Sequence, residues 1–259
     1  MIFNYLNLDI IHISKSPDLY YFKPRQIYFQ SELQIVRESI YVDCPCPMYQ
    51  DSYHIHQVGS WGPLPAIIHL YRKLNNEGKL KTLDIGCAFG TLAAYCSSIG
   101  YEASAIDFVP LEKYLGYKTQ EKYNIEYKQV SIESEDMPWG ENIFNIVTMS
   151  EVLEHFRYQP LGTLKKIRNS LKPGGVLLIT TPALGVHWPA EFFDCDFEDI
   201  PANNGQFDND PDKHWKIYSA MELNRLLDMA GFNSSVTMFI NINTGMESLY
   251  AVAVKKEKI

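Results

Sequence analysis

Glu151, Glu154 and His155 are the residues of this sequence whose types and spacing most directly suggest chemistry. Separations of three and four residues would place them on one side of a single helical turn. Two carboxylates and an imidazole suit a divalent cation, which would lower the pKa of a bound hydroxyl group. His155 is also a candidate general base, because the unperturbed pKa of an imidazole lies near neutrality. A His155 that only packs beneath a loop is the structural alternative.

A second group of residues, within the segment LDIGCAFG, is suited to holding a nucleoside. Gly86 and Gly90 allow a sharp turn and a close approach of the backbone to a ligand. Asp107 follows 21 positions after Gly86, where its carboxylate can accept hydrogen bonds from both ribose hydroxyls. A nicotinamide dehydrogenase has nearly the same layout, and a tight turn with a solvated aspartate also fits. This segment alone therefore leaves the cofactor open.

Two cysteines and two histidines form a further candidate metal set: Cys44, Cys46, His54 and His56. Their spacing matches no common structural zinc site. Prolines at positions 45 and 47 constrain the loop. A proline-stiffened loop with free thiols is the preferred interpretation.

Alternating strands and helices are predicted from Lys81 onward. The expected strands are short and apolar, over residues 80–85, 102–107, 125–130, 144–150 and 175–181. Amphipathic helical stripes lie between them, one around residues 89–99 and one over 161–171. This alternation predicts a parallel sheet with helices on both faces. Asp107 and His155 then follow strand ends, at the edge where open α/β sheets bind ligands.

The two ends of the chain depart from this alternation. A helix is expected from Ser219, with Glu222 in capping-box spacing, to Gly231. Two strands over 234–242 and 247–256 should follow it as an antiparallel hairpin. Residues 1–78 are predicted to form an extension or cap that packs on a core of residues 79–259, with one clear helix starting near Leu64.

The stretch from Leu83 to Phe232 resembles the class I S-adenosylmethionine-dependent methyltransferases. SEDMPW is similar to the acidic-x-Leu-Pro-Phe segment of that family, and SEVLEHF is similar to the end of its fourth strand. LKPGGVLLITTP resembles its fifth-strand signature, and HWKIYSAMELNRLLDMAGF resembles the helix before its terminal hairpin. The resemblance implies an α/β fold: a Rossmann-like, doubly wound, mostly parallel seven-stranded sheet with a C-terminal antiparallel hairpin and an N-terminal extension.

The resemblance also implies S-adenosylmethionine as cofactor and a role for each matching residue. The methionine part would lie against Asp84, Gly86, Cys87, Ala88 and Gly90. Asp107 would bind the ribose and Phe108 would lie against the adenine, whose edge Glu133 and Ser134 would flank. Ser150, at the end of the fourth strand, is a further candidate contact. Ala88 stands where the family has a glycine, and alanine is tolerable there if the residue keeps a negative φ.

The pattern Glu-x-x-Glu-His with a later histidine resembles the metal-dependent O-methyltransferases of ubiquinone synthesis. It also resembles the 2′-O-methyltransferases that modify the 3′ end of small RNAs. This resemblance adds His214 as a fourth candidate ligand for a divalent cation, beside Glu151, Glu154 and His155. Family members without a metal also carry Glu-His at this strand end, so the pattern does not decide whether a cation binds here.

An acidic segment is expected to cover the acceptor. Residues 191–212 contain eight acidic side chains and no Lys or Arg, within a lid or insertion of about residues 185–214. Aromatic side chains beside it would form an apolar wall: Trp188, Phe192, Phe193 and Trp215. A solvated acidic loop is the alternative. With a formal net charge of −8, this neighbourhood disfavours nucleic acid as a partner.

The predicted function is O-methylation of a hydroxyl on a small molecule, a sugar or a secondary metabolite. The alternatives are a small-RNA terminal methyltransferase and a catalytically silent scaffold that binds S-adenosylmethionine. The five cysteines are sparse and odd in number, which favours a reducing cytoplasm. Polar residues interrupt the N-terminal apolar stretch, so no membrane partner is expected. The sequence does not indicate an oligomeric state.

Overall fold

The computed structural model describes residues 29–43, 59–75, 78–185, 193–202, 213–240, 245 and 247–256. Several predicted features fall outside the described residues: Cys44, Cys46, His54, His56, Trp188, Phe192 and most of the acidic segment 191–212. The interpretation of the Cys/His loop and the lid hypothesis therefore stay predictions.

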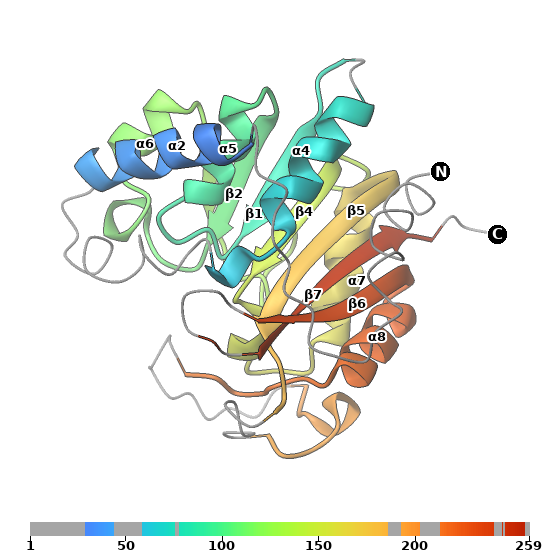
Figure 1. Cartoon of the computed structure of the whole chain (residues 1–259). Coiled ribbons are helices and arrows are strands. Elements are labelled where there is room, and N and C mark those ends of the chain that lie inside the picture. Colours follow the sequence, from blue (N-terminus) through green and yellow to red (C-terminus); the bar gives the residue numbers. More distant parts are fainter. Residues whose placement is uncertain are drawn as a thin grey trace.

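A seven-stranded sheet forms the centre of the molecule, with strand order β3-β2-β1-β4-β5-β7-β6 (Figure 1). The strands are β1 Lys81–Ile85, β2 Glu102–Asp107, β3 Glu126–Gln129, β4 Phe144–Ser150, β5 Leu171–Pro182, β6 Phe232–Ile240 and β7 Glu247–Lys255. Strands β1 to β5 pair in parallel, and β7 pairs antiparallel with both β5 and β6. The predicted parallel sheet with a terminal antiparallel hairpin is confirmed.

Helices cover both faces of this sheet (Figure 1). They are α2 Phe29–Asp43, α4 Leu64–Leu74, α5 Thr91–Ser98, α6 Tyr117–Lys122, α7 Leu161–Ser170 and α8 Ala220–Met229. Helices α2, α4 and α5 contribute to the hydrophobic cluster on one face, and α7 and α8 contribute to the cluster on the other. The fold is thus doubly wound. Among the described residues, no helix is both long and apolar enough to cross a membrane.

Side chains alternate along the central strands, so each strand serves both clusters. Ile146 of β4 belongs to the cluster beneath α4 and α5, whereas its neighbour Val147 belongs to the cluster beneath α7 and α8. Leu178 and Leu177 of β5 divide in the same way. Successive side chains of a strand point to opposite faces, and both faces here are covered. The central strands therefore read as continuous apolar runs.

The described helices of the N-terminal part share their core with the sheet. Leu33 and Val36 of α2 and Ile68 of α4 are buried in the same cluster as Leu178 of β5. The division between residues 1–78 and 79–259 stays a prediction. The packing of α2 and α4 supports contact between the two parts.

The boundary between α7 and β5 differs from the prediction. Leu171 was expected to end the helical stripe, but it is the first residue of β5 and pairs with Phe144 of β4. The pairing then shifts register before Ile146. Gly174, with φ of +71°, lets the chain bend away and rejoin the ladder, as at a β-bulge.

Candidate functional site

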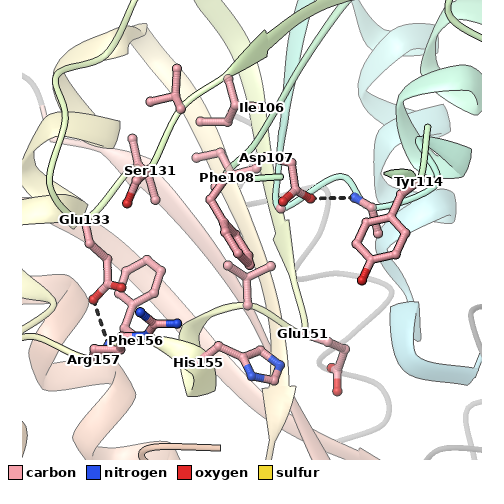
Figure 2. Close-up of a pocket in the computed structure, with 16 residues that line it drawn as sticks. Ile106, Asp107, Phe108, Tyr114, Ser131, Glu133, Glu151, His155, Phe156 and Arg157 are labelled. Carbon is pink, nitrogen blue, oxygen red and sulfur yellow. Dashed lines mark hydrogen bonds between the residues drawn. The ribbon is translucent and has the colours of Figure 1, made fainter. Parts of the chain in front are cut away.

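A cleft that is partly open to solvent lies at the carboxyl ends of β1, β2, β3 and β4 (Figure 2). It is lined by Ile85, Gly86, Ala88, Ile106, Asp107, Phe108, Tyr114, Val130, Ser131, Ile132, Glu133, Glu151, Val152, His155, Phe156 and Arg157. Parallel strands bring their carboxyl ends to one edge, and the loops that follow them supply these side chains. Both predicted groups, the glycine loop and the His155 segment, open onto this one cleft.

The glycines of the loop allow close packing of neighbouring side chains. Gly86 has φ of +65°, and a Cβ atom there would lie 2.5 Å from the side chain of Val152. Gly90 has φ of +68°, and a Cβ there would lie 2.1 Å from Leu115. Gly86 lines the cleft, whereas Gly90 does not. Larger residues are therefore excluded at both positions before any ligand is considered.

 

Ala88 has φ of +43°, in the left-handed region that costs a residue with a Cβ atom about 1–2 kcal/mol. Its backbone N–H donates a hydrogen bond of 2.9 Å to Oδ2 of Asp107. The negative φ under which alanine would be tolerated without strain is therefore not found. The bond to Asp107, at the end of the next strand, fixes the direction of the Ala88 amide.

Asp107 ends β2 and presents a carboxylate at the cleft (Figure 2). Its Oδ1 accepts a hydrogen bond of 3.3 Å from the N–H of Val109, in addition to the Ala88 bond on Oδ2. Burial raises the pKa of Asp107, and the backbone donors oppose that rise. A carboxylate has about four acceptor positions, so capacity remains for ligand hydroxyls. Phe108 beside it is 51% exposed, which leaves an aromatic face open to a ligand.

Asp84 is buried and does not line the cleft. Its Oδ1 accepts a hydrogen bond of 2.7 Å from the hydroxyl of Thr148 in β4. Burial raises the pKa of Asp84 to about 7; the Thr148 bond opposes this rise and the nearby Asp107 adds to it. In this structure Asp84 ties β1 to β4, and its proposed contact with the methionine part stays a prediction.

Three other predicted contacts also lie outside the cleft lining. Cys87 is buried, and burial raises the pKa of its thiol. Ser150 Oγ lies 2.6 Å from Oγ1 of Thr180 in β5. Ser134 is exposed and follows the cleft residue Glu133. Their roles toward the cofactor stay predictions.

Glu133 lines the cleft at the end away from Asp107 (Figure 2). Its Oε1 accepts hydrogen bonds from the backbone N–H groups of Arg157, at 2.8 Å, and Tyr158, at 3.0 Å. Burial raises the pKa of Glu133, and these two bonds oppose the rise. Glu133 therefore fixes the segment that brings Phe156 and Arg157 to the cleft.

The expected helical turn through Glu151, Glu154 and His155 is wrong. Glu151 has φ of +53°, and only the 3₁₀ helix η3, Leu153–His155, follows it. Glu151 and His155 line the cleft, whereas Glu154 is 1% exposed and does not. The Glu154 Oε2 accepts a hydrogen bond of 2.8 Å from the hydroxyl of Thr181. The positive φ turns Glu151 away from the face that a regular helix would share.

Glu154, His155 and His214 do come together, each with one ligand atom within 4.8 Å of the others. His155 Nε2 lies 3.7 Å from Oε1 of Glu154, and the rings of His155 and His214 have centroids 5.0 Å apart. Oε1 of Glu154 has no hydrogen-bond partner among the described residues. Burial raises the pKa of Glu154 to about 7. Of the four candidate ligands, Glu151 is outside this group.

The segment that carries His214 lies far beyond η3 along the chain and is hydrogen-bonded to Glu154 and His155. The backbone N–H groups of Trp215 and Lys216 donate to the Glu154 carbonyl, at 2.7 and 3.2 Å. Nδ1 of His155 lies 3.0 Å from the carbonyl oxygen of Lys213. Trp215 is buried, with its ring centroid 5.9 Å from that of Phe193. Of the four residues expected to form the aromatic wall, the two that the structure describes, Phe193 and Trp215, pack against each other.

A protein-family model described as a methyltransferase domain matches residues 62–235. This range is more than half of the chain and includes every strand that borders the cleft. The chain belongs to this methyltransferase family. It is the class I family that uses S-adenosylmethionine as methyl donor, as the fold and the resemblance predicted.

Curated relatives of this methyltransferase domain carry the name ubiquinone biosynthesis O-methyltransferase. The protein from Rickettsia conorii is 29% identical over 120 residues, which cover 46% of this chain and 40% of that protein. The protein from Histophilus somni is 29% identical over 119 residues, covering 44% of this chain and 49% of that protein. The chain therefore matches less than half of the length of either relative.

Solved methyltransferase structures show the same fold. The 1,6-didemethyltoxoflavin-N1-methyltransferase of Burkholderia thailandensis, with bound 1,6-didemethyltoxoflavin and S-adenosylhomocysteine, superimposes with a TM-score of 0.58 and 18% identity. That match covers 92% of this chain and 99% of the other. A methyltransferase from Methanosarcina mazei gives a TM-score of 0.51 and 18% identity, covering 73% of this chain and 99% of the other.

Sequence reasoning missed a set of cleft residues in this methyltransferase domain: Tyr114, Val130, Ser131, Ile132, Phe156 and Arg157. Three of them directly follow β3, so the rule that ligands bind at carboxyl strand ends could have indicated them. Tyr114 and Arg157 carry no such signal. Their places depend on how the loops after β2 and η3 turn back over the sheet edge.

Proposed function

We propose that this chain transfers a methyl group from S-adenosylmethionine to a hydroxyl group of a small molecule, a sugar or a secondary metabolite. The observation that carries the proposal is that Asp107 and His155 open onto one cleft. The cleft offers a carboxylate for a ribose, an exposed aromatic ring for an adenine, and an imidazole for a proton. The relatives named O-methyltransferases support oxygen as the methylated atom.

The cleft fits a nucleoside cofactor in its chemistry. Asp107 keeps free acceptor capacity for ribose hydroxyls, and Phe108 leaves a ring face available for stacking. When bound, S-adenosylmethionine supplies a methyl group on a positively charged sulfur, which is already activated for displacement. The work left to the protein is mainly alignment, plus removal of a proton from the acceptor hydroxyl.

The hydrogen bond between His155 and Lys213 assigns a role to each ring nitrogen. A carbonyl oxygen can only accept, so Nδ1 carries a proton and donates to Lys213 at 3.0 Å. Nε2 of a neutral His155 then has a lone pair. In the proposed reaction the acceptor oxygen forms a bond to the methyl carbon, the carbon–sulfur bond breaks, and Nε2 takes the hydroxyl proton.

The cofactor part of the proposal is tested with Asp107→Asn. This change removes the negative charge and leaves a donor in place of one acceptor, so the affinity for S-adenosylhomocysteine should fall by roughly 1–3 kcal/mol. Titration calorimetry measures it, and Asp136→Asn, an exposed aspartate outside the cleft, is the control. Wild-type affinity in Asp107→Asn would remove Asp107 from the site. Tight binding of NAD in place of S-adenosylhomocysteine would overturn the assignment.

The base is tested with His155→Ala. Affinity for S-adenosylhomocysteine should be nearly unchanged, while turnover of a hydroxylated acceptor falls roughly 10²–10⁴-fold. Single-turnover transfer of a labelled methyl group, run against a panel of hydroxylated metabolites, measures it. Equal losses of cofactor affinity and turnover would show that His155 has only a packing role.

A divalent cation is the second candidate for activating the hydroxyl, and three residues fit it. Glu154, His155 and His214 provide one oxygen and two nitrogens within 4.8 Å, and Glu154 Oε1 needs a partner. These residues would hold the cation, which would lower the pKa of a bound hydroxyl. In that case a chelator should abolish activity, Mg²⁺ or Mn²⁺ should restore it, and Glu154→Gln should lower cation affinity measured directly. Full activity in the presence of chelator would leave His155 as a base.

A further inference from the structure

Tyr114 places a hydroxyl group at the cleft for which the proposed function has no role so far. It follows the short 3₁₀ helix η2, Leu111–Lys113, and lines the cleft. In Figure 2 its hydroxyl points away from the hydrogen bond that joins Ala88 to Asp107. Tyr114 therefore shares the cleft with the carboxylate that we assign to the ribose.

The ring of Tyr114 is held in place from two sides. Its centroid lies 5.1 Å from that of Phe89, at an interplanar angle of 58°, and Nζ of Lys113 lies 5.1 Å above it. The next residue, Leu115, is buried and packs directly against Gly90 of the glycine loop. The segment that carries Tyr114 thus packs on the glycine loop. This packing fixes the direction in which the Tyr114 side chain points.

The Tyr114 hydroxyl has no hydrogen-bond partner among the described residues, although the side chain is half-buried. Two nearby tyrosines differ in this respect. The hydroxyl of Tyr127 donates to the carbonyl of Val109, and the hydroxyl of Tyr117 donates to the carboxylate of Glu112. A hydroxyl that is fixed beside a ligand cleft is available to hydrogen-bond whatever fills the cleft.

We infer that the Tyr114 hydroxyl forms a hydrogen bond with the ribosyl-methionine part of bound S-adenosylmethionine, beside the Asp107 contact. The inference rests on the proposed cofactor site. That part of the cofactor carries ribose hydroxyls, a carboxylate and an ammonium group, and a phenol hydroxyl can donate to or accept from each of them. In the proposed arrangement Phe108 and Glu133 would contact the adenine, and the Tyr114 hydroxyl would add a polar contact at the other end of the nucleoside.

Tyr114→Phe tests the inference, because it keeps the ring contacts with Phe89 and removes only the hydroxyl. A lost hydrogen bond of about 0.5–1.5 kcal/mol predicts about a 2- to 12-fold weaker Kd for S-adenosylhomocysteine by calorimetry. Tyr117→Phe is the matched control, since its hydroxyl binds Glu112 at the surface, and its Kd should equal that of the wild type. Thermal unfolding of both variants checks that the fold is intact.

A second probe, 5′-methylthioadenosine, lacks the amino-acid part of the cofactor. A loss with both probes places the bond on the ribose, and a loss with S-adenosylhomocysteine alone places it on the methionine part. Unchanged affinity of folded Tyr114→Phe for both probes would overturn the inference and leave the cofactor site intact. Failure of the wild-type protein to bind either probe would instead overturn the proposed function, and this inference with it.

Discussion

Ala88 shows at the scale of one residue how the loop conformation is imposed. Its φ of +43° suits glycine, and relieving it should gain about 1–2 kcal/mol. Glycine also makes the unfolded chain more flexible, which costs about 0.4–1 kcal/mol. We therefore expect Ala88→Gly to raise the free energy of unfolding by up to about 1.5 kcal/mol in denaturant titrations. Ala94→Gly within α5 is the control and should lower it by about 1 kcal/mol or more. A clear loss of stability in Ala88→Gly would show that the backbone of Ala88 is not strained in the folded protein.

Asp84 makes the stability of the fold depend on pH. Its pKa is raised to about 7 by burial, whereas an unfolded aspartate titrates near 3.9. Between these values the unfolded chain has lost a proton that the folded chain retains. Folded-state stability therefore falls as pH rises from about 4 to about 7, and the loss is complete above that range.

Asp84→Asn removes this titration and retains an acceptor for the Thr148 hydroxyl. Between pH 5 and pH 7.5 its free energy of unfolding should fall less than that of the wild type. Parallel denaturant titrations at several pH values give the difference between the two proteins, which isolates Asp84 from the other buried carboxyls. Identical pH profiles would show that Asp84 is already ionised in the folded chain at pH 5.

At the scale of elements, α8 helps to fix the segment that carries His214. Ser219 caps α8 by accepting a hydrogen bond of 3.2 Å from the N–H of Glu222, as the sequence predicted. The Glu222 carboxylate binds other partners: the N–H of Phe197 at 2.9 Å and Nζ of Lys216 at 3.0 Å. Lys216 also donates to the Cys195 carbonyl at 2.8 Å. These bonds join the two described flanks of the acidic insertion to α8.

Breaking the ion pair between Lys216 and Glu222 should be costly, because the two side chains are only 6% and 12% exposed. Lys216→Met leaves the Glu222 carboxylate without its cation and should lower the free energy of unfolding by about 3–5 kcal/mol. Arg225→Met is the matched control: Arg225 pairs with Asp196 on the same segment but is 48% exposed, so its loss should cost about 1 kcal/mol or less. Equal losses of unfolding free energy in the two variants would show that burial does not determine the cost of breaking these ion pairs.

At the scale of the whole molecule, charge distribution bears on the acceptor. The net charge of −8 opposes the approach of a polyanion. Two of the basic side chains that could have formed a phosphate-binding face donate hydrogen bonds to backbone carbonyl groups instead. Lys166 donates to the carbonyls of Ile132 and Glu135, and Arg168 donates to those of Gly231 and Lys256. We therefore expect RNA to be a poor substrate.

The measurement is transfer of a labelled methyl group to short single- and double-stranded RNA at low salt, where electrostatic attraction is strongest. No labelling is expected under conditions in which a hydroxylated small molecule is labelled. Labelling of a 3′-terminal ribose would overturn the small-molecule proposal and favour the small-RNA alternative. Binding of S-adenosylhomocysteine without transfer to any acceptor would favour the silent scaffold.

The sequence by itself determined the order and type of the elements and the family of the domain. Strand and helix periodicities, the glycine loop and the run LKPGGVLLITTP depend on local physics: side-chain alternation, steric freedom and the burial of both sheet faces. These features predict the parallel sheet, its terminal hairpin and the edge at which Asp107 and His155 lie.

Only the tertiary structure decided which side chains share the cleft and which sit behind it. The positive φ of Glu151 separates that residue from Glu154, and the Lys213–Lys216 segment brings His214 to His155 from 59 positions away along the chain. Tyr114 reaches the cleft because Leu115 packs on Gly90. Each of these placements depends on contacts between distant segments, and spacing along one segment carries no information about them.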